Sequence, residues 1–331
     1  MGDEAGEAGG VNGRMTLEAS AQIVYSECMA LKKGERCLIV FDKKKKGIAQ
    51  AFYDVAQTIT EKVEALEIPE PKTNGQEPAK YIAEKMKDCD VLLLITSKSL
   101  SHTDARRNAT KKHGVRAASM PGITEEMAWR TLAIDYKGLD EKGKKLQKLL
   151  RPGAKLHLTT PLGTDLTLTI GPEIFNDNGI YTKDGAFGNL PAGEAGFAPV
   201  EGTTSGILVI NKSMAGVGKL VEPLKLNIKG GFVTGITGGK QAGMLKTLLK
   251  KQRDSSVYNI AEFAVGTNPK AKVTGLTLED EKVAGTIHMA IGDNTSYAGG
   301  TTPSPVHLDG VVGRPTVEVD GKPIIRDGRL L

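Results

Sequence analysis

The sequence has few cysteines, few aromatic residues and no long apolar run. Cys28, Cys37 and Cys89 are the three cysteines among 331 residues. Each lies in an apolar stretch, which favours buried free thiols and a reducing, cytoplasmic location. The longest apolar runs, at 37–41 and 91–95, are far shorter than the roughly 20 residues of a membrane-spanning helix. We therefore expect no membrane anchor.

The charge of the chain is also modest. The formal net charge is +5 and the isoelectric point is near 8.9, and no basic stripe with interleaved aromatic residues occurs. This composition gives no support to a nucleic-acid partner. A small molecule or a short peptide is the expected substrate. The length exceeds the roughly 100 to 200 residues of one domain, which predicts two domains.

The first part of the chain has an α/β pattern. Residues 1–14 are acidic and glycine-rich, which predicts a disordered tail. Within 15–150, buried-strand runs such as 37–41 and 91–95 alternate with amphipathic helical segments. Such alternation predicts an N-terminal domain built on an open parallel α/β sheet.

Beyond Pro152 the pattern changes to alternating polar and apolar residues separated by turns. The segments 155–160 and 165–170 predict a β-hairpin, and Asp320-Gly321 predicts a two-residue turn between two further strands. One helix is expected near 241–253. We therefore predict a second domain at 151–331 that is mainly β (α+β) and carries the metal-binding and catalytic groups.

Histidines and a carboxylate occur close together in this second domain. His288, His307 and Asp309 lie among strand-like apolar neighbours. Residues two apart on a strand point to the same face, so His307 and Asp309 would aim an imidazole and a carboxylate at one point. Such a pair suits a metal ion, although isolated histidines in such segments are more often structural.

Two further segments carry a family resemblance. Asn189-Leu-Pro-Ala-Gly-Glu194 and Ala261-Glu262-Phe-Ala-Val-Gly-Thr-Asn-Pro269, together with the segments that end at His288 and Asp309, resemble the aminopeptidase T family of metallopeptidases. The stretches 101–106 and 118–124 of the first domain also look like that family. The resemblance implies a homodimer and a metal centre whose ligands are Glu194, Glu262, His288, His307 and Asp309.

The function implied by this resemblance is that of a metal-dependent aminopeptidase. Two divalent ions, Zn²⁺, Co²⁺ or Mn²⁺, would share Glu262 and activate a water molecule that attacks the peptide bond. Glu194, Tyr297 and His102 are the predicted catalytic side chains, with Tyr297 as a donor to the oxyanion. Tyr297 comes about two residues later than the tyrosine of the family, and the segment between the two histidines is shorter than in authentic peptidases.

Two alternative functions remain open. The first is a mononuclear non-haem Fe(II) ring-cleaving dioxygenase of the 2,5-dihydroxypyridine type, since such enzymes look like relatives of this fold. In it, His288, His307 and Asp309 would hold the iron and His102 would act as a pocket acid or base. The second is a non-catalytic metal-binding homologue, which the shifted position of Tyr297 favours.

Overall fold

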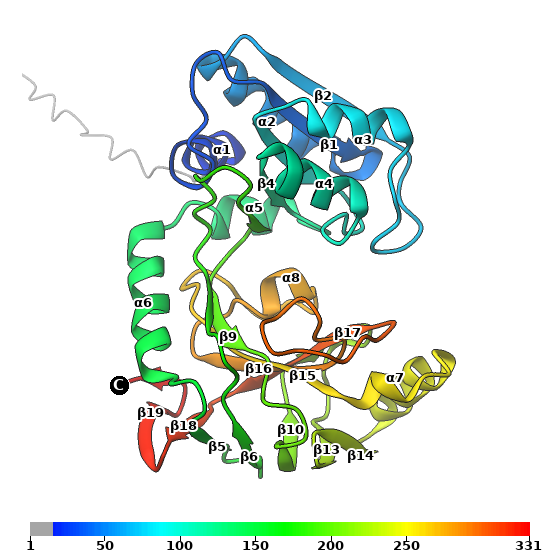
Figure 1. Ribbon diagram of the computed structural model, residues 1–331, viewed down its shortest axis with the longest axis vertical. Helices are drawn as coiled ribbons and strands as arrows, with labels where there is room; N and C mark the ends of the chain where they lie inside the picture. Colours follow the sequence, from blue (N-terminus) through cyan, green and yellow to red (C-terminus); the bar gives the residue numbers. More distant parts are fainter. Residues whose placement is uncertain (1–15) are drawn as a thin grey trace, which may run out of the picture.

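The protein consists of an α/β layer above two packed β-sheets (Figure 1). The structure, a computed structural model, describes residues 16–331, so the predicted tail at 1–14 lies outside the described residues. No helix within the described part is long and apolar enough to cross a membrane. All three cysteines are buried and free, as expected.

A parallel five-stranded sheet forms the α/β layer. Its strand order is β2-β1-β3-β4-β8, and each neighbouring pair is parallel. The strands are β1 (Cys37–Asp42), β2 (Val63–Ile68), β3 (Val91–Ile95), β4 (Arg116–Ser119) and β8 (Phe187–Asn189).

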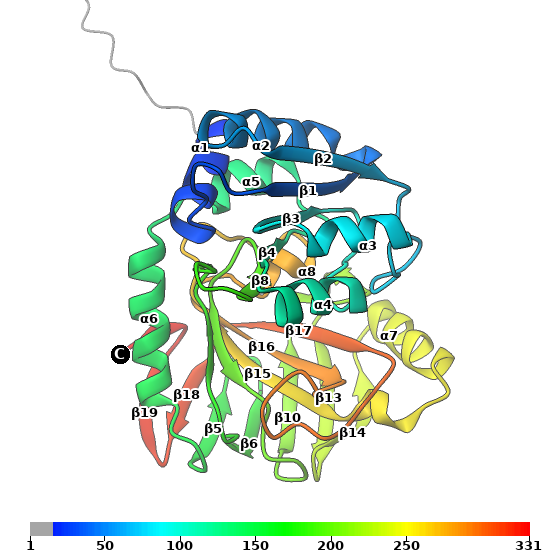
Figure 2. The same ribbon diagram turned by 45° about the horizontal axis from the view of Figure 1, so that its top comes forward.

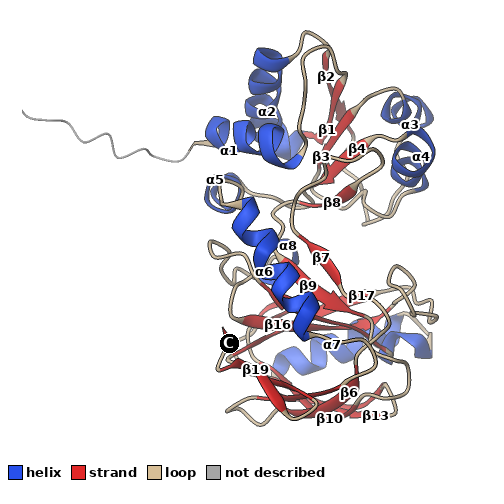
Figure 3. Ribbon diagram, turned by 60° about the vertical axis from the view of Figure 1, so that its left-hand side comes forward, coloured by secondary structure: helices blue, strands red, loops and turns tan. Residues whose placement is uncertain are grey.

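Helices cover both faces of this sheet (Figure 3). In β1, Ile39 and Phe41 pack into the core on one face, whereas Leu38 and Val40 pack into the core on the other. Because both faces are covered, the strand is a continuous apolar run instead of an alternating one. The helices on the first face are α1 (Leu17–Ile23), which continues into a π-helical turn (Val24–Cys28), α2 (Lys46–Ile59) and α5 (Glu125–Thr131). The helices on the second face are α3 (Lys80–Lys87) and α4 (Asp104–His113).

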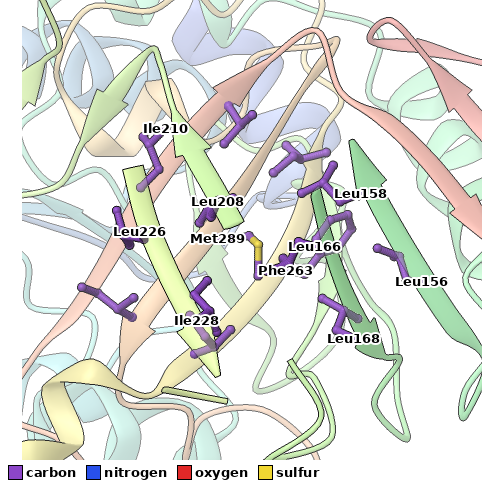
Figure 4. Close-up of a cluster of buried hydrophobic side chains, with 14 of the residues drawn as sticks. Leu156, Leu158, Leu166, Leu168, Leu208, Ile210, Leu226, Ile228, Phe263 and Met289 are labelled. Atoms are coloured by element: carbon purple, nitrogen blue, oxygen red, sulfur yellow. The ribbon is translucent and has the colours of Figure 1, made fainter. Parts of the chain in front are cut away.

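Two antiparallel sheets form the rest of the molecule. The larger has the order β14-β13-β10-β6-β5-β18-β19-β20 and the smaller has the order β12-β11-β17-β16-β15-β9-β7. Leucines and isoleucines of the larger sheet pack against Phe263 and Met289 of the smaller sheet in a shared core (Figure 4). The strands of the larger sheet are β5 (Lys155–Thr159), β6 (Asp165–Thr169), β10 (Ser205–Ile210), β13 (Leu224–Lys229), β14 (Phe232–Thr237), β18 (Thr316–Val319), β19 (Lys322–Arg326) and β20 (Arg329–Leu330). Those of the smaller sheet are β7 (Phe175–Asp177), β9 (Glu194–Phe197), β11 (Ser213–Met214), β12 (Gly218–Lys219), β15 (Ile260–Gly266), β16 (Thr286–Gly292) and β17 (His307–Gly313).

Three helices accompany these sheets. They are α6 (Tyr136–Leu149), which runs down one side from the upper layer, α7 (Lys240–Lys251) and the short α8 (Thr277–Asp280). Short 3₁₀ turns occur at Lys43–Lys45 and Ser255–Tyr258. Figure 2 shows that α8 and the ends of β16 and β17 lie beneath the α/β layer.

One segment connects the α/β layer to the smaller β-sheet. The chain leaves β7 in the smaller sheet, adds β8 to the edge of the parallel sheet, and returns to the smaller sheet as β9. Glu194, the first residue of β9, therefore lies only a few residues beyond Asn189, the last residue of β8.

The predicted fold class is confirmed. The parallel α/β sheet and the antiparallel β region both exist, and the hairpin turn at Asp320 and Gly321 has the two positive φ angles, 47° and 74°, of a type I′ turn. The sequence analysis did not identify α5, which begins after the N-cap Thr124. The predicted boundary between two domains at residue 150 stays a prediction. β8 lies beyond residue 150 in the sequence yet pairs with β4 of the parallel sheet.

Candidate metal centre

Four adjacent strands carry the five predicted metal ligands. Glu194 begins β9, Glu262 lies in β15, His288 in β16, and His307 and Asp309 in β17. These strands are neighbours in the order β17-β16-β15-β9.

The register of these strands explains why the side chains meet. Ala290 of β16 lies opposite Glu262 on one side and opposite Asp309 on the other. His288 is two residues from Ala290 and therefore points to the same face. The intervening residues Phe263 and Met289 point to the other face, into the sandwich core. The small side chain of Ala290 leaves room between the polar groups on the face turned toward the α/β layer.

The ligand atoms form two overlapping groups in which all atoms lie within 4.8 Å of one another. One group is Glu194, Glu262 and His288, and the other is Glu262, His307 and Asp309. Nε2 of His288 is 3.4 Å from a carboxylate oxygen of Glu194 and 3.4 Å from one of Glu262. Nε2 of His307 is 3.0 Å from the other oxygen of Glu262 and 3.4 Å from Asp309. The structure thus brings all five residues together, and their role as ligands stays a prediction.

The iron triad of the first alternative is divided between these groups. His288 belongs to one group, whereas His307 and Asp309 belong to the other. The two groups meet at Glu262, which contacts both imidazoles.

The surrounding carboxylates raise the pKa of both imidazoles. Burial acts to lower the pKa of His288, but its interactions with Glu262, Glu194 and Asp309 outweigh burial and raise it to about 9. For His307 burial is likewise outweighed, by Asp309 and Glu262, and its pKa lies well above the usual range. Protons on the rings therefore stabilise this cluster of carboxylates when no other cation does so, and a metal ion would replace those protons.

The orientation of His307 is typical of a metal ligand. Its Nδ1 donates a hydrogen bond to the backbone carbonyl of Asp293 at 2.7 Å, because a carbonyl oxygen can only accept. This bond fixes the ring and leaves Nε2 directed at Glu262 and Asp309. A hydrogen bond from the distal nitrogen to a carbonyl is common for ligating histidines.

The donor set fits a divalent transition-metal ion. Imidazole nitrogens and carboxylate oxygens suit Zn²⁺, Mn²⁺ or Fe²⁺, whereas soft ions would require thiolates. Within residues 16–331, Oε2 of Glu194 is buried and has no hydrogen-bond partner. A buried carboxylate oxygen that faces an imidazole at 3.4 Å without forming a hydrogen bond requires an explanation, and a bound ion provides one.

Tyr297 reaches the centre despite its shifted position in the sequence. Its hydroxyl donates a hydrogen bond of 2.6 Å to Oε2 of Glu262. Its ring stacks on Phe175, with 5.4 Å between ring centroids, and lies 5.9 Å from the ring of His307. The loop that carries Tyr297 is fastened by Glu201, which accepts hydrogen bonds from Asn294, Thr301 and Thr302.

His102 is not a member of either group of ligand atoms. It lies in the loop between β3 and α4, and its side chain is exposed. Partial desolvation lowers its pKa, and the charges of Arg106, Arg107 and His307 lower the pKa further. These effects favour the unprotonated imidazole of His102.

The sequence analysis missed a buried lysine. Nζ of Lys282 lies 2.5 Å from Oε1 of Glu194, 2.9 Å from Glu281 and 3.7 Å from Asp177, and its side chain is 1% exposed. A lysine within Asp280-Glu281-Lys282 is ordinarily expected on the surface. Gly285 and His288, which follow Lys282 closely in the sequence, were a signal that this segment lies near the centre.

The fold and this centre define a mixed α/β protein with a buried group of imidazoles and carboxylates suited to a metal ion. A family model described as 2,5-dihydroxypyridine 5,6-dioxygenase matches residues 19–331. The chain belongs to the 2,5-dihydroxypyridine 5,6-dioxygenase family.

Proteins of both families are similar to the chain in sequence, but over different shares of it. The chain is 26% identical over 311 residues to the 2,5-dihydroxypyridine 5,6-dioxygenase of Pseudomonas putida, covering 84% of this chain and 85% of that protein. It is 32% identical over 196 residues to aminopeptidase T of Thermus aquaticus, but this match covers only 52% of this chain and 46% of the peptidase.

Solved structures show the fold. The structure of the dioxygenase from Pseudomonas putida matches with a TM-score of 0.82 at 21% identity, over 95% of this chain and 96% of that chain. Aminopeptidase T of Thermus thermophilus matches with a TM-score of 0.71 at 18% identity, over 95% and 98%.

These comparisons correct the predicted function. The assignment as an aminopeptidase, a hydrolase of peptide bonds, is wrong, because the dioxygenase family matches nearly the whole chain. The resemblance to aminopeptidase T reflects a more distant relationship. The imidazole and carboxylate motifs are compatible with both families, so they did not separate the two.

Proposed function

We propose that this protein is a metal-dependent ring-cleaving dioxygenase that acts on a dihydroxypyridine. The observation that carries the proposal is the family match over residues 19–331, a stretch that contains all five imidazole and carboxylate residues of the centre. The relative from Pseudomonas putida acts on 2,5-dihydroxypyridine, as its name states. A flat, hydroxylated heteroaromatic ring is therefore the expected substrate class.

Fe(II) is the metal that this proposal requires. His288, His307 and Asp309 provide two imidazoles and one carboxylate, the set that non-haem iron oxygenases use. Bound Fe(II) would supply the one-electron chemistry by which an aromatic ring reacts with O₂. Glu262 contacts both imidazoles and accepts a hydrogen bond from Tyr297, so it keeps the two halves of the centre together.

In the α/β layer, His102 would act as the base that accepts a proton from the substrate. His102 can take a proton from a ring hydroxyl, because its lowered pKa favours the unprotonated imidazole. Its exposed position in the loop after β3 leaves it accessible to a substrate bound above the carboxylates.

The homodimer remains a prediction, which a light-scattering mass near the 35.2 kDa of one chain would contradict.

Iron analysis of matched variants tests the proposed ligands. The wild-type protein, purified without metal and reconstituted anaerobically with Fe(II), should bind one ion per chain. His307→Ala and Asp309→Ala should lose most of this iron. His157→Ala is the control, because the side chain of His157 lies on the solvent-facing side of β5 beside Asp165 and is 41% exposed, so its loss should leave the iron content unchanged. Full iron binding by His307→Ala would rule out these ligands.

A further inference from the structure

Arg106 is a buried cation without an acidic partner. Its side chain belongs to α4 and is only 7% exposed. Burial, together with the nearby charge of Arg107, lowers its pKa to about 10. No carboxylate within the described part of the chain forms an ion pair with it. Burying an unpaired charge costs free energy, so its retention requires a reason.

The stability of α4 does not provide that reason. Arg106 lies in the first turn of the helix, where the helix dipole disfavours a positive charge. The N-cap is already supplied by Thr103, whose hydroxyl accepts a hydrogen bond from the backbone N–H of Arg106 at 3.2 Å. A neutral side chain would therefore serve the helix better.

The contacts of the guanidinium fix the loop that precedes the helix. Nε of Arg106 donates a hydrogen bond of 2.6 Å to the backbone carbonyl of Ser101, the residue before His102. The guanidinium carbon lies 3.8 Å from the ring centroid of Phe187 in β8. The planar group thus binds the loop and the strand at the same time, which a lysine cannot do.

Further hydrogen bonds fasten the same loop to the same strand. The hydroxyl of Ser101 lies 2.9 Å from that of Ser119 in β4 and 3.2 Å from Oδ1 of Asn189 in β8. Along the segment from Leu100 to Arg106, the backbone is held and most side chains are buried, whereas those of His102 and Asp104 are exposed. The loop is therefore a rigid turn that presents an imidazole.

We propose that Arg106 is a positioning residue, whose guanidinium locks the turn before α4 onto β8 and so holds His102 at a set place relative to the metal centre. β8 leads within a few residues to Glu194, so the same strand places the imidazole and one carboxylate of the centre. This inference rests on the proposed function insofar as it gives His102 a role in proton transfer.

The test compares Arg106→Lys with Arg107→Lys. Arg107 is the matched control, because it is exposed, retains its charge in the variant, and forms its one ion pair within the described residues with Asp104, at 3.6 Å. For Arg106→Lys we expect kcat to fall at least about tenfold with KM within about twofold of wild type. The iron content should be unchanged, and Arg107→Lys should match wild type throughout. Wild-type kcat in a folded Arg106→Lys, or loss of its iron, would overturn the proposal.

A second measurement does not depend on activity. The NMR resonance of the His102 ring, assigned by its absence in His102→Gln, should shift and broaden in Arg106→Lys but not in Arg107→Lys. If Arg106→Lys does not fold, Phe187→Leu removes the ring beneath the guanidinium and should give the same NMR change. An unchanged resonance would overturn the positioning role. If the wild type shows no dioxygenase turnover, the proposed function fails, and the NMR comparison alone decides the role of Arg106.

Discussion

The ammonium group of Lys282 lies 2.5 Å from Oε1 of Glu194. This contact occupies one oxygen of the carboxylate and leaves the other, Oε2, directed toward His288. Burial raises the pKa of Glu194, whereas Lys282 and His288 counteract that effect. Lys282 therefore favours an ionised Glu194 and limits the carboxylate to one free oxygen at the centre.

Replacing Lys282 should strongly destabilise the protein. Lys282→Met leaves Glu194, Glu281 and Asp177 buried without their shared counter-charge, which should lower the free energy of unfolding by about 3 to 5 kcal/mol. Urea unfolding of the metal-free protein measures this change. Lys85→Met, which breaks an exposed pair with Glu64, should cost at most about 1 kcal/mol. Equal effects of the two variants would show that the Lys282 contacts contribute little.

Removing the hydroxyl of Tyr297 should have a smaller effect. Tyr297→Phe keeps the ring on Phe175 but removes the hydrogen bond to the buried carboxylate of Glu262. A hydrogen bond to a charged group contributes about 1.5 to 3 kcal/mol, so the metal-free protein should lose an amount in that range. Tyr53→Phe is the control, since Tyr53 only accepts a bond from Gln57 on an exposed helix face. Identical unfolding curves for wild type and Tyr297→Phe would contradict the geometry of this hydrogen bond.

The loop that carries Tyr297 should loosen in acid. Although burial acts to raise the pKa of Glu201, its hydrogen bonds with Asn294, Thr301 and Thr302 lower it to about 2. Because the folded-state pKa is depressed, the contribution of Glu201 is present above its usual value of 4.5 and is lost as pH falls from 4.5 toward 2. Unfolding measured across this pH range should therefore show a smaller acid-dependent loss in Glu201→Gln than in wild type. Glu61→Gln, at an exposed position of another loop, should retain the wild-type dependence.

Much of the fold follows from local sequence patterns. The apolar run at 91–95 is β3, and the alternating segments 155–160 and 165–170 form the hairpin of β5 and β6. The glycine of the Asp320-Gly321 turn tolerates the positive φ that the turn needs. These features depend on neighbouring residues, so a single sequence contains the required information.

Features that depend on distant contacts were not predictable in this way. Lys282 is buried beside Asp177 and Glu194, which lie far earlier in the sequence, as well as beside its neighbour Glu281. Likewise, β8 joins the parallel sheet through pairing with β4, far away in the sequence. The predicted ligands were found through motifs, yet imidazole and carboxylate donors serve hydrolases and oxygenases alike. The shifted Tyr297 and the short segment between the histidines were the signals of a departure from the peptidases.

Oxygen uptake with 2,5-dihydroxypyridine tests the central claim most directly. Protein reconstituted with Fe(II) should consume one O₂ for each dihydroxypyridine molecule lost, and uptake should disappear in His307→Ala while His157→Ala retains it. The same preparation should release no chromophore from an aminoacyl-nitroanilide. If the iron-loaded protein consumes no O₂ with this substrate, whereas the Zn²⁺- or Co²⁺-loaded protein hydrolyses the nitroanilide, the dioxygenase assignment is contradicted.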